Sequence, residues 1–195
     1  AIVMAALAKK DLDRPTAEGR RVVRHESIDR IFHWLMAASI FVLIFTGTAP
    51  ILGLRIAWLN IHWISGLLLT FLIAAHIIRS MFWQDFKSML LTPKDFSEPF
   101  DSTSKPGKYY FEQKGLHWAA TVVVLAVIVT GVLMFMQIDT PFWERTNSMP
   151  EDQLGLVFLL HGLSTLALVA LASTHIYFAL RPEKIFYTRS MLAGW

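Results

Sequence analysis

Four long apolar stretches constrain the fold of this sequence more than any other feature. Each is at least as long as the roughly 20 residues that a helix needs to cross the hydrocarbon core of a bilayer. Proline and tryptophan mark several of their ends, where a missing N–H costs little and indole rings favour the membrane interface. The sequence therefore predicts four membrane-spanning helices at about 31–54, 58–83, 116–138 and 154–180.

The composition agrees with a membrane protein and limits its cofactor chemistry. Of the 195 residues, 54% are hydrophobic and 17% are charged, whereas about 25% are charged in ordinary soluble domains. The sequence has no cysteine, which excludes disulfides, thiolate metal sites, iron–sulfur clusters held by this chain and c-type haem attachment. Any metal or cofactor must therefore use histidine, methionine or oxygen ligands.

The basic residues predict the orientation of the helices. Sixteen lysines and arginines lie before the first stretch, in the tail, or in the long second connection together with the end of the preceding stretch, where Arg79 lies. The other two connections hold only Arg55 and Arg145. By the positive-inside rule, both termini are cytoplasmic. We expect an all-α, integral membrane four-helix bundle of residues 31–180 in a bacterial inner membrane, with cytoplasmic segments 1–30 and 181–195.

The start of the chain does not have the pattern of a signal peptide. Residues 1–8 are apolar and Lys9 and Lys10 follow them, which is the reverse of the order in a signal peptide. We interpret this segment either as a tail that lies against a partner or the membrane surface, or as a remnant of processing.

An internal repeat relates the two halves of the chain. A His-Trp pair is followed by a Thr-Gly pair in each half, and the threonine comes 13 positions after the histidine, at His33 and Thr46 and again at His117 and Thr130. A second pattern, His-x-x-Ser with another histidine further along, occurs at His62, Ser65 and His76 and at His161, Ser164 and His175. The first two helices therefore resemble the last two.

The spacing of the histidines points to a cofactor. His62 and His76 are 14 residues apart, as are His161 and His175. In an α-helix 14 residues return to within about 40° of the same face and rise about 21 Å. His62 and His161 would share the periplasmic level, and His76 and His175 the cytoplasmic one, where His33 and His117 also belong. Ionisable residues inside a membrane usually mark a function.

Haem is the cofactor that suits two levels of facing histidines, because imidazole is a good axial ligand for iron. Bis-histidine ligation leaves no open coordination position, which favours electron transfer. A zinc or copper site needs three or four converging ligands, and a proton relay needs intramembrane carboxylates; the sequence predicts neither. Glycines that would admit a flat macrocycle or a neighbouring helix are Gly47, Gly66, Gly131 and Gly162.

With these features, the sequence resembles the cytochrome b (gamma) subunits of respiratory formate dehydrogenases, within the wider bacterial di-haem cytochromes b. The resemblance covers about residues 24–180. The matching features are Ile28-Asp29-Arg30 with His33-Trp34, His62 with Gly66, Lys108-Tyr109 with Gln113-Lys114, and the His161 and His175 pair.

The resemblance implies a ligand set for two b haems. His62 and His161 would hold the periplasmic haem, and His33 and His175 the cytoplasmic one. Spacing alone pairs His76, not His33, with His175, so His76 is the alternative ligand. His76 and His117 would otherwise line a quinone or proton path, bond haem propionates or hold a third haem.

The resemblance also implies a quinone site near the cytoplasmic haem, at the start of the third helix. The family pattern K-Y-N-x-x-Q-K is matched by residues 108–114 except that Tyr110 replaces the asparagine. The expected quinone residues are Tyr110, Glu112, Gln113, Lys114 and His117, and the quinone is menaquinone or ubiquinone.

The implied function is electron transfer from an iron–sulfur subunit and a molybdenum or tungsten catalytic subunit, through two haems, to quinone. We expect lipid contacts, no nucleic-acid partner and no substrate dehydrogenase chemistry in this chain itself. The alternatives are a cytochrome b subunit of a hydrogenase or sulfur-compound oxidoreductase, a stand-alone quinone-linked oxidoreductase, and a haem-free anchor or transporter.

Overall fold

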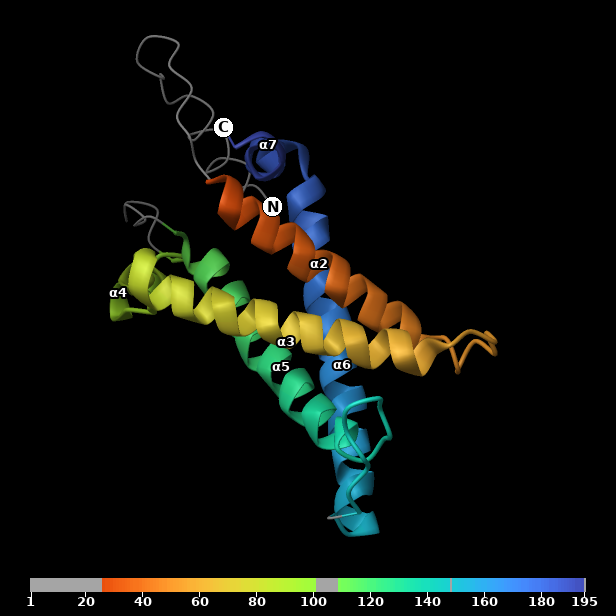
Figure 1. The fold of residues 1–195 in the computed structure, drawn as a ribbon. Coiled ribbons are helices and arrows are strands. Elements are labelled where there is room, and N and C mark those ends of the chain that lie inside the picture. The colour runs from red at the N-terminus through yellow and green to blue at the C-terminus, as the bar shows by residue number, and fades with distance from the viewer. Residues whose placement is uncertain (1–25, 101–108, 148, 195) are drawn as a thin grey trace. The chain divides into compact units, whose positions relative to one another are not determined.

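The structure is a computed structural model that describes residues 26–100, 109–147 and 149–194. Four long helices follow one another in the described chain (Figure 1). They are α2 (Ser27–Thr48), α3 (Trp58–Trp83), α5 (Phe111–Phe135) and α6 (Glu151–Leu180). Four shorter helices are also described: η2 (Phe86–Met89), α4 (Pro93–Ser97), η3 (Pro182–Lys184) and α7 (Ile185–Ala193). The all-α prediction is confirmed, and most of the predicted segment 1–30, like Lys108, lies outside the described residues.

All four long helices are apolar enough to cross a membrane. Each has a mean hydropathy of 1.8 or more over an 18-residue window, and only 11% of each window is buried within the protein. Large side chains such as Phe41, Phe71 and Leu166 are exposed along them. An α-helix satisfies its own backbone hydrogen bonds, so such a helix can present these side chains directly to lipid. The prediction of four membrane helices is confirmed within the described chain.

The first helix ends six residues earlier than the apolar stretch suggests. Proline at position 50 has no backbone N–H and restricts the preceding residue away from helical geometry. Gly53 then adopts a positive φ of 69°, which costs glycine little because it has no Cβ. A turn at 49–53 therefore follows Thr48, and α3 begins at Trp58.

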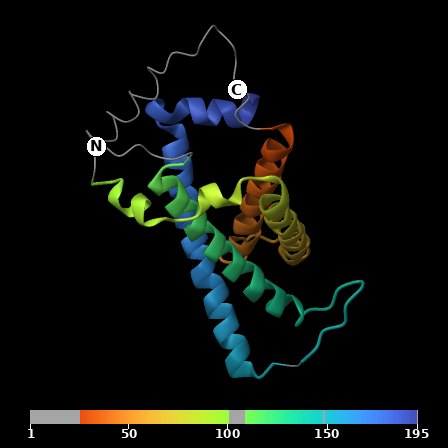
Figure 2. The same cartoon turned by 90° about the vertical axis from the view of Figure 1, so that its left-hand side faces the viewer.

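The third helix begins at Phe111, five residues before the apolar stretch. Tyr110 has extended backbone geometry at the N-cap, and its N–H donates to Oε1 of Gln113 at 3.1 Å. This bond satisfies a backbone donor that the helix leaves unpaired at its start. After α5, the chain makes an irregular loop before α6 begins at Glu151 (Figure 2).

The chain divides into two compact units. Of the described residues, the first unit contains 26–37 and 172–194, and the second contains those between 38 and 171. Unit 1 therefore joins the start of α2 to the end of α6 and to α7. Unit 2 contains the rest of α2, all of α3 and α5, and the first two thirds of α6.

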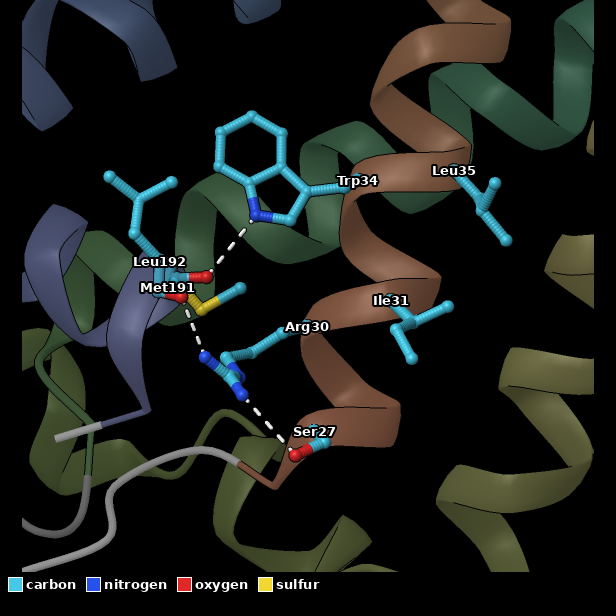
Figure 3. A pocket seen from close by; sticks show the side chains of 7 residues that line it. All are labelled: Ser27, Arg30, Ile31, Trp34, Leu35, Met191 and Leu192. Atoms are coloured by element: carbon cyan, nitrogen blue, oxygen red, sulfur yellow. Dashed lines mark hydrogen bonds between the residues drawn. The ribbon is translucent and has the colours of Figure 1, made fainter.

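In unit 1, α2 is fastened to the backbone of α7 by two side chains (Figure 3). Arg30 donates from Nη1 to the carbonyl oxygen of Leu192 at 2.6 Å, and the indole of Trp34 donates to the carbonyl oxygen of Met191 at 3.2 Å. These side chains line an open pocket of about 410 Å³. Carbonyls in the last turn of a helix have no intrahelical partner, so α2 supplies the donors that the end of α7 needs.

Unit 2 repeats this arrangement at the start of α5. Lys114 donates from Nζ to the carbonyl oxygen of Leu90 at 3.1 Å, and the indole of Trp118 donates to the carbonyl oxygen of Met89 at 2.9 Å. Both acceptors follow a serine, in Ser88-Met89-Leu90 here and in Ser190-Met191-Leu192 in unit 1. The internal repeat therefore extends beyond the membrane helices into the short segments that follow α3 and α6.

Unit 2 adds a buried ion pair to the repeated pattern. The ammonium of Lys114 contacts Oδ1 of Asp95 at 2.8 Å, and both side chains are more than 90% buried. Asp95 also accepts from the N–H and the hydroxyl of Thr92. The hydrogen bond from Lys114 holds the pKa of the Asp95 carboxyl below its ordinary value of 3.8, and Thr92 lowers it further. This pair fastens α4 to α5.

We predict that Asp95→Asn destabilises the protein by about 3–5 kcal/mol at neutral pH, because it leaves the Lys114 charge buried without its counter-charge. A depressed carboxyl pKa contributes stability above its unfolded value, and that contribution is lost as pH falls through the folded value. The melting temperature of the wild type in detergent should therefore fall below about pH 4 more steeply than that of D95N. The exposed Asp85→Asn is the control, and equal melting temperatures for D95N and D85N at pH 7 would contradict the prediction.

Candidate functional site

Two pairs of histidine rings face each other in the structure, one in each unit. In unit 2, His62 of α3 and His161 of α6 have ring centroids 6.3 Å apart with an interplanar angle of 71°. In unit 1, His33 of α2 and His175 of α6 have centroids 6.0 Å apart with an angle of 54°. His33, the residue that the family resemblance implied as the partner of His175, has its ring opposite His175 within unit 1.

The separation of the rings suits a metal ion held between them. A histidine nitrogen lies about 2 Å from a bound transition metal, and about 1.1 Å from the centre of its own ring. Two opposed rings that share one metal therefore have centroids about 6.2 Å apart. Within the described residues no group of three or more potential metal-binding side chains converges. The sites offer two imidazoles each, which is the donor set of a bis-histidine haem.

The ring of His62 is fixed on one side by the Thr-Gly pair of α2. Oγ1 of Thr46 lies 2.9 Å from Nδ1 of His62, and Thr46 is fully buried. A Cβ built on Gly47 would lie 3.4 Å from Cε1 of the same ring. A side chain at this position would therefore be in van der Waals contact with the edge of the imidazole.

The ring of His161 is held in the same way by the Thr-Gly pair of α5. Oγ1 of Thr130 lies 2.9 Å from Nδ1 of His161, and a Cβ on Gly131 would lie 3.4 Å from its Cε1. In contrast, a Cβ on Gly66 would meet only Leu43 at 3.9 Å, and Gly162 has no neighbour within 4 Å. Two of the four glycines singled out in the sequence therefore lie where an added Cβ would touch a histidine of the facing pair.

The remaining two membrane histidines lie in unit 2. His117 of α5 makes an edge contact with Trp118, with centroids 5.9 Å apart, as His33 does with Trp34 at 5.3 Å. His117 also interacts electrostatically with His76 of α3. These two residues are the counterparts, in the internal repeat, of the His33 and His175 pair.

The residues predicted to bind quinone gather at the start of α5, where several already have structural roles. Tyr110 and Gln113 form the N-terminal cap of the helix. Lys114 is buried in its ion pair, while Glu112 is exposed and His117 is half-buried. Within this group, Glu112 and His117 are the titratable side chains that lie outside the cap and the ion pair.

Sequence reasoning missed two features of the site. Asp95, the partner of Lys114, lies 19 residues from it in the connection between α3 and α5, and no spacing rule relates the two. Thr46 and Thr130 were recognised only as markers of the repeat, although each contacts a histidine of the other repeated element. The recurrence of Thr-Gly at one distance from His-Trp was the signal that these positions matter.

Comparison with known proteins identifies the family to which these features belong. The profile of the family described as prokaryotic cytochrome b561 matches residues 24–194, which is most of the sequence. The chain belongs to the prokaryotic cytochrome b561 family. Membership in this cytochrome b family implies haem b, and the four apolar helices agree with an integral membrane protein.

Characterised relatives of this family member share modest identity over most of its length. The formate dehydrogenase cytochrome b556 subunit of Haemophilus influenzae is 28% identical over 90% of this chain and 76% of the relative. The cytochrome b556(fdo) subunit of formate dehydrogenase from Escherichia coli K12 is 25% identical over 89% of this chain and 85% of the relative. No solved structure matches the chain.

Proposed function

We propose that the chain is the membrane cytochrome b subunit of a formate dehydrogenase-like complex, and that it carries electrons from an iron–sulfur partner to membrane quinone. The observation that supports this most directly is the presence of two facing histidine pairs, at His62 and His161 and at His33 and His175. The names of the relatives point to the same class of complex.

The four paired histidines are the residues that we propose would hold two b haems. His62 and His161 would hold one haem within unit 2, and His33 and His175 the other within unit 1. Haem bound there supplies a one-electron centre that does not need to bind or release a substrate. The role of this chain is to fix the imidazoles in place and, through its apolar helices, to keep water away from them.

The proposed orientation places both termini in the cytoplasm of a bacterium. The support for it is the charge asymmetry of the sequence, in which Arg55 and Arg145 are the only basic residues of the two short connections. His62 lies near the start of α3, immediately after a short connection, so its haem would be the periplasmic one. His33 lies near the start of α2, so its haem would be the cytoplasmic one.

Reporter fusions test this orientation. A fluorescent protein fused to the C-terminus should be bright, because it stays in the cytoplasm, and alkaline phosphatase fused there should be inactive. Alkaline phosphatase inserted in the 49–57 connection should instead be active. The reverse pattern would contradict the proposed orientation, and the haem at His62 would then lie on the cytoplasmic side and the haem at His33 on the periplasmic side.

A quinone, menaquinone or ubiquinone, is the proposed electron acceptor at the start of α5. His117 and Glu112 lie there as titratable groups able to exchange protons with a quinone oxygen. Gln113 and Tyr110 contribute by capping the helix, and Lys114 by its ion pair, so these three would shape the site. If the protons come from the cytoplasm, quinone reduction separates charge across the membrane.

We predict that the purified protein shows a b-type reduced-minus-oxidised spectrum with two haems per chain, by pyridine haemochrome assay against amino-acid analysis. His161→Ala should lose one haem because the His62 site loses a ligand, and His175→Ala should lose the other. His76→Ala should keep both haems.

The matched comparison is between His33→Ala and His76→Ala. If His76→Ala lost a haem while His33→Ala kept both, the cytoplasmic ligand would be His76. A purified wild type without a b-type spectrum would refute the proposed function.

We predict that affinity purification from the native membrane recovers an iron–sulfur subunit together with a catalytic subunit that contains molybdenum or tungsten. Mass spectrometry identifies the proteins, and elemental analysis identifies the metal. Recovery of a nickel-containing partner would instead indicate a hydrogenase, and recovery of neither class would contradict the formate dehydrogenase assignment.

A further inference from the structure

The same arrangement of threonine, glycine and histidine occurs on both rings of one histidine pair. Thr46 of α2 contacts His62 and Thr130 of α5 contacts His161, and a Cβ added to the glycine after each threonine would touch the same ring. The threonine–histidine distances are equal at 2.9 Å, and a Cβ added to either glycine would lie 3.4 Å from Cε1 of the ring. Two separate helices, α2 and α5, therefore place a threonine and a glycine against a histidine ring with the same geometry.

The hydrogen atoms at Thr46 can be placed from the distances alone. Its hydroxyl has one hydrogen and lies 2.7 Å from the carbonyl oxygen of Val42. Two oxygens approach that closely only with a hydrogen between them, and a carbonyl has none to give. The hydroxyl therefore donates to Val42. The contact between Thr46 and Nδ1 of His62 then needs its hydrogen from the imidazole, so Nδ1 is the protonated ring nitrogen.

The second copy leads to the same assignment. The hydroxyl of Thr130 lies 2.7 Å from the carbonyl oxygen of Ala126 and therefore donates to it. Nδ1 of His161 then donates to Oγ1 of Thr130 at 2.9 Å. The two rings also interact with the backbones of Leu43 and Val127, respectively, one turn before the contacted glycines.

We propose that Thr46 and Thr130 are positioning residues that hold both imidazoles of the His62 and His161 pair as Nδ1–H tautomers, keep Nε2 free for iron, and lower the midpoint potential of that haem. The proposal rests on the function proposed above. A hydrogen bond donated by the outer nitrogen of a ligating histidine makes the imidazole a stronger electron donor. A stronger donor favours ferric over ferrous iron.

Because both threonines are buried, water cannot easily take the place of a removed hydroxyl as the hydrogen-bond acceptor for Nδ1–H. Thr46 is 1% exposed and Thr130 is 7% exposed, so water has little access to Nδ1 if a hydroxyl is removed. Each hydroxyl also gives its own hydrogen to a carbonyl, which polarises the oxygen and improves it as an acceptor. In this way α2 and α5 each supply a hydroxyl oxygen as acceptor for a histidine Nδ1–H, in a membrane interior that has few other acceptors.

Both threonines act on a single haem, which makes the proposal specific. The His33 and His175 pair lies in the other unit. Removal of either hydroxyl should therefore shift one redox component of the protein and leave the other unchanged. Removal of both should shift that same component further.

The test is an optical redox titration of purified wild type, Thr46→Val, Thr130→Val and the double variant. Valine keeps the shape of threonine and removes the oxygen. We expect the component that His161→Ala abolishes to titrate at a higher potential in each valine variant, and highest in the double variant. Thr46→Ser and Thr130→Ser should restore the wild-type potential, because serine keeps the hydroxyl.

A matched control is Thr48→Val. Thr48 donates to the carbonyl oxygen of Ile44 at 2.9 Å on the same helix. This variant therefore removes an equivalent hydrogen bond from a hydroxyl to a carbonyl and should leave both potentials unchanged.

Electron paramagnetic resonance of the oxidised haems adds a second measurement. The low-spin signal of the affected haem should change in the valine variants and recover in the serine variants, since it reports ligand orientation and donor strength.

The outcomes separate this proposal from the proposed function. A wild type without haem would refute the function. A wild type with two haems whose potentials are the same in Thr46→Val and Thr130→Val would refute the role of the threonines. If the valine variants lose the haem, full recovery of haem and potential in the serine variants supports the proposal. Serine variants that behave like valine variants would overturn it.

Discussion

The hydrogen bond between a threonine hydroxyl and the Nδ1–H of a histidine is the interaction on which the site in unit 2 depends. In a membrane interior an imidazole without a partner is costly, and an imidazole free to rotate is a poor ligand. Thr46 and Thr130 provide the partner and fix the ring, because each hydroxyl is itself anchored to a carbonyl one turn earlier. Glycine at the next position gives the ring room to lie against the helix.

Internal duplication explains why the protein uses the same devices twice. Each His-Trp helix start supplies a cation and an indole to the carbonyls of a Met-Leu segment, through Arg30 and Trp34 in unit 1 and through Lys114 and Trp118 in unit 2. The copies have also diverged. Lys114 gains Asp95 as a buried partner, so the second copy has an added link between α4 and the start of α5.

Much of the fold could be predicted because few backbone conformations are possible for a segment that crosses a lipid bilayer. A run of about 20 apolar residues must become a helix, since no other single segment satisfies its own backbone groups in hydrocarbon. The ends of the helices were less predictable, because they depend on local groups. The proline at position 50 and the positive φ of Gly53 shorten the first helix, and the cap formed by Tyr110 and Gln113 lengthens the third.

The sequence by itself determined the four membrane helices, the internal repeat and the set of histidines able to hold iron, because periodicity and hydropathy are properties of the chain. Only the tertiary structure decided which histidines face each other. His33 and His76 both suit His175 by depth, and the packing of the helices places His33 opposite it. The structure also shows what a linear pattern cannot encode: the hydroxyls of Thr46 and Thr130 lie 2.9 Å from Nδ1 of histidines on other helices.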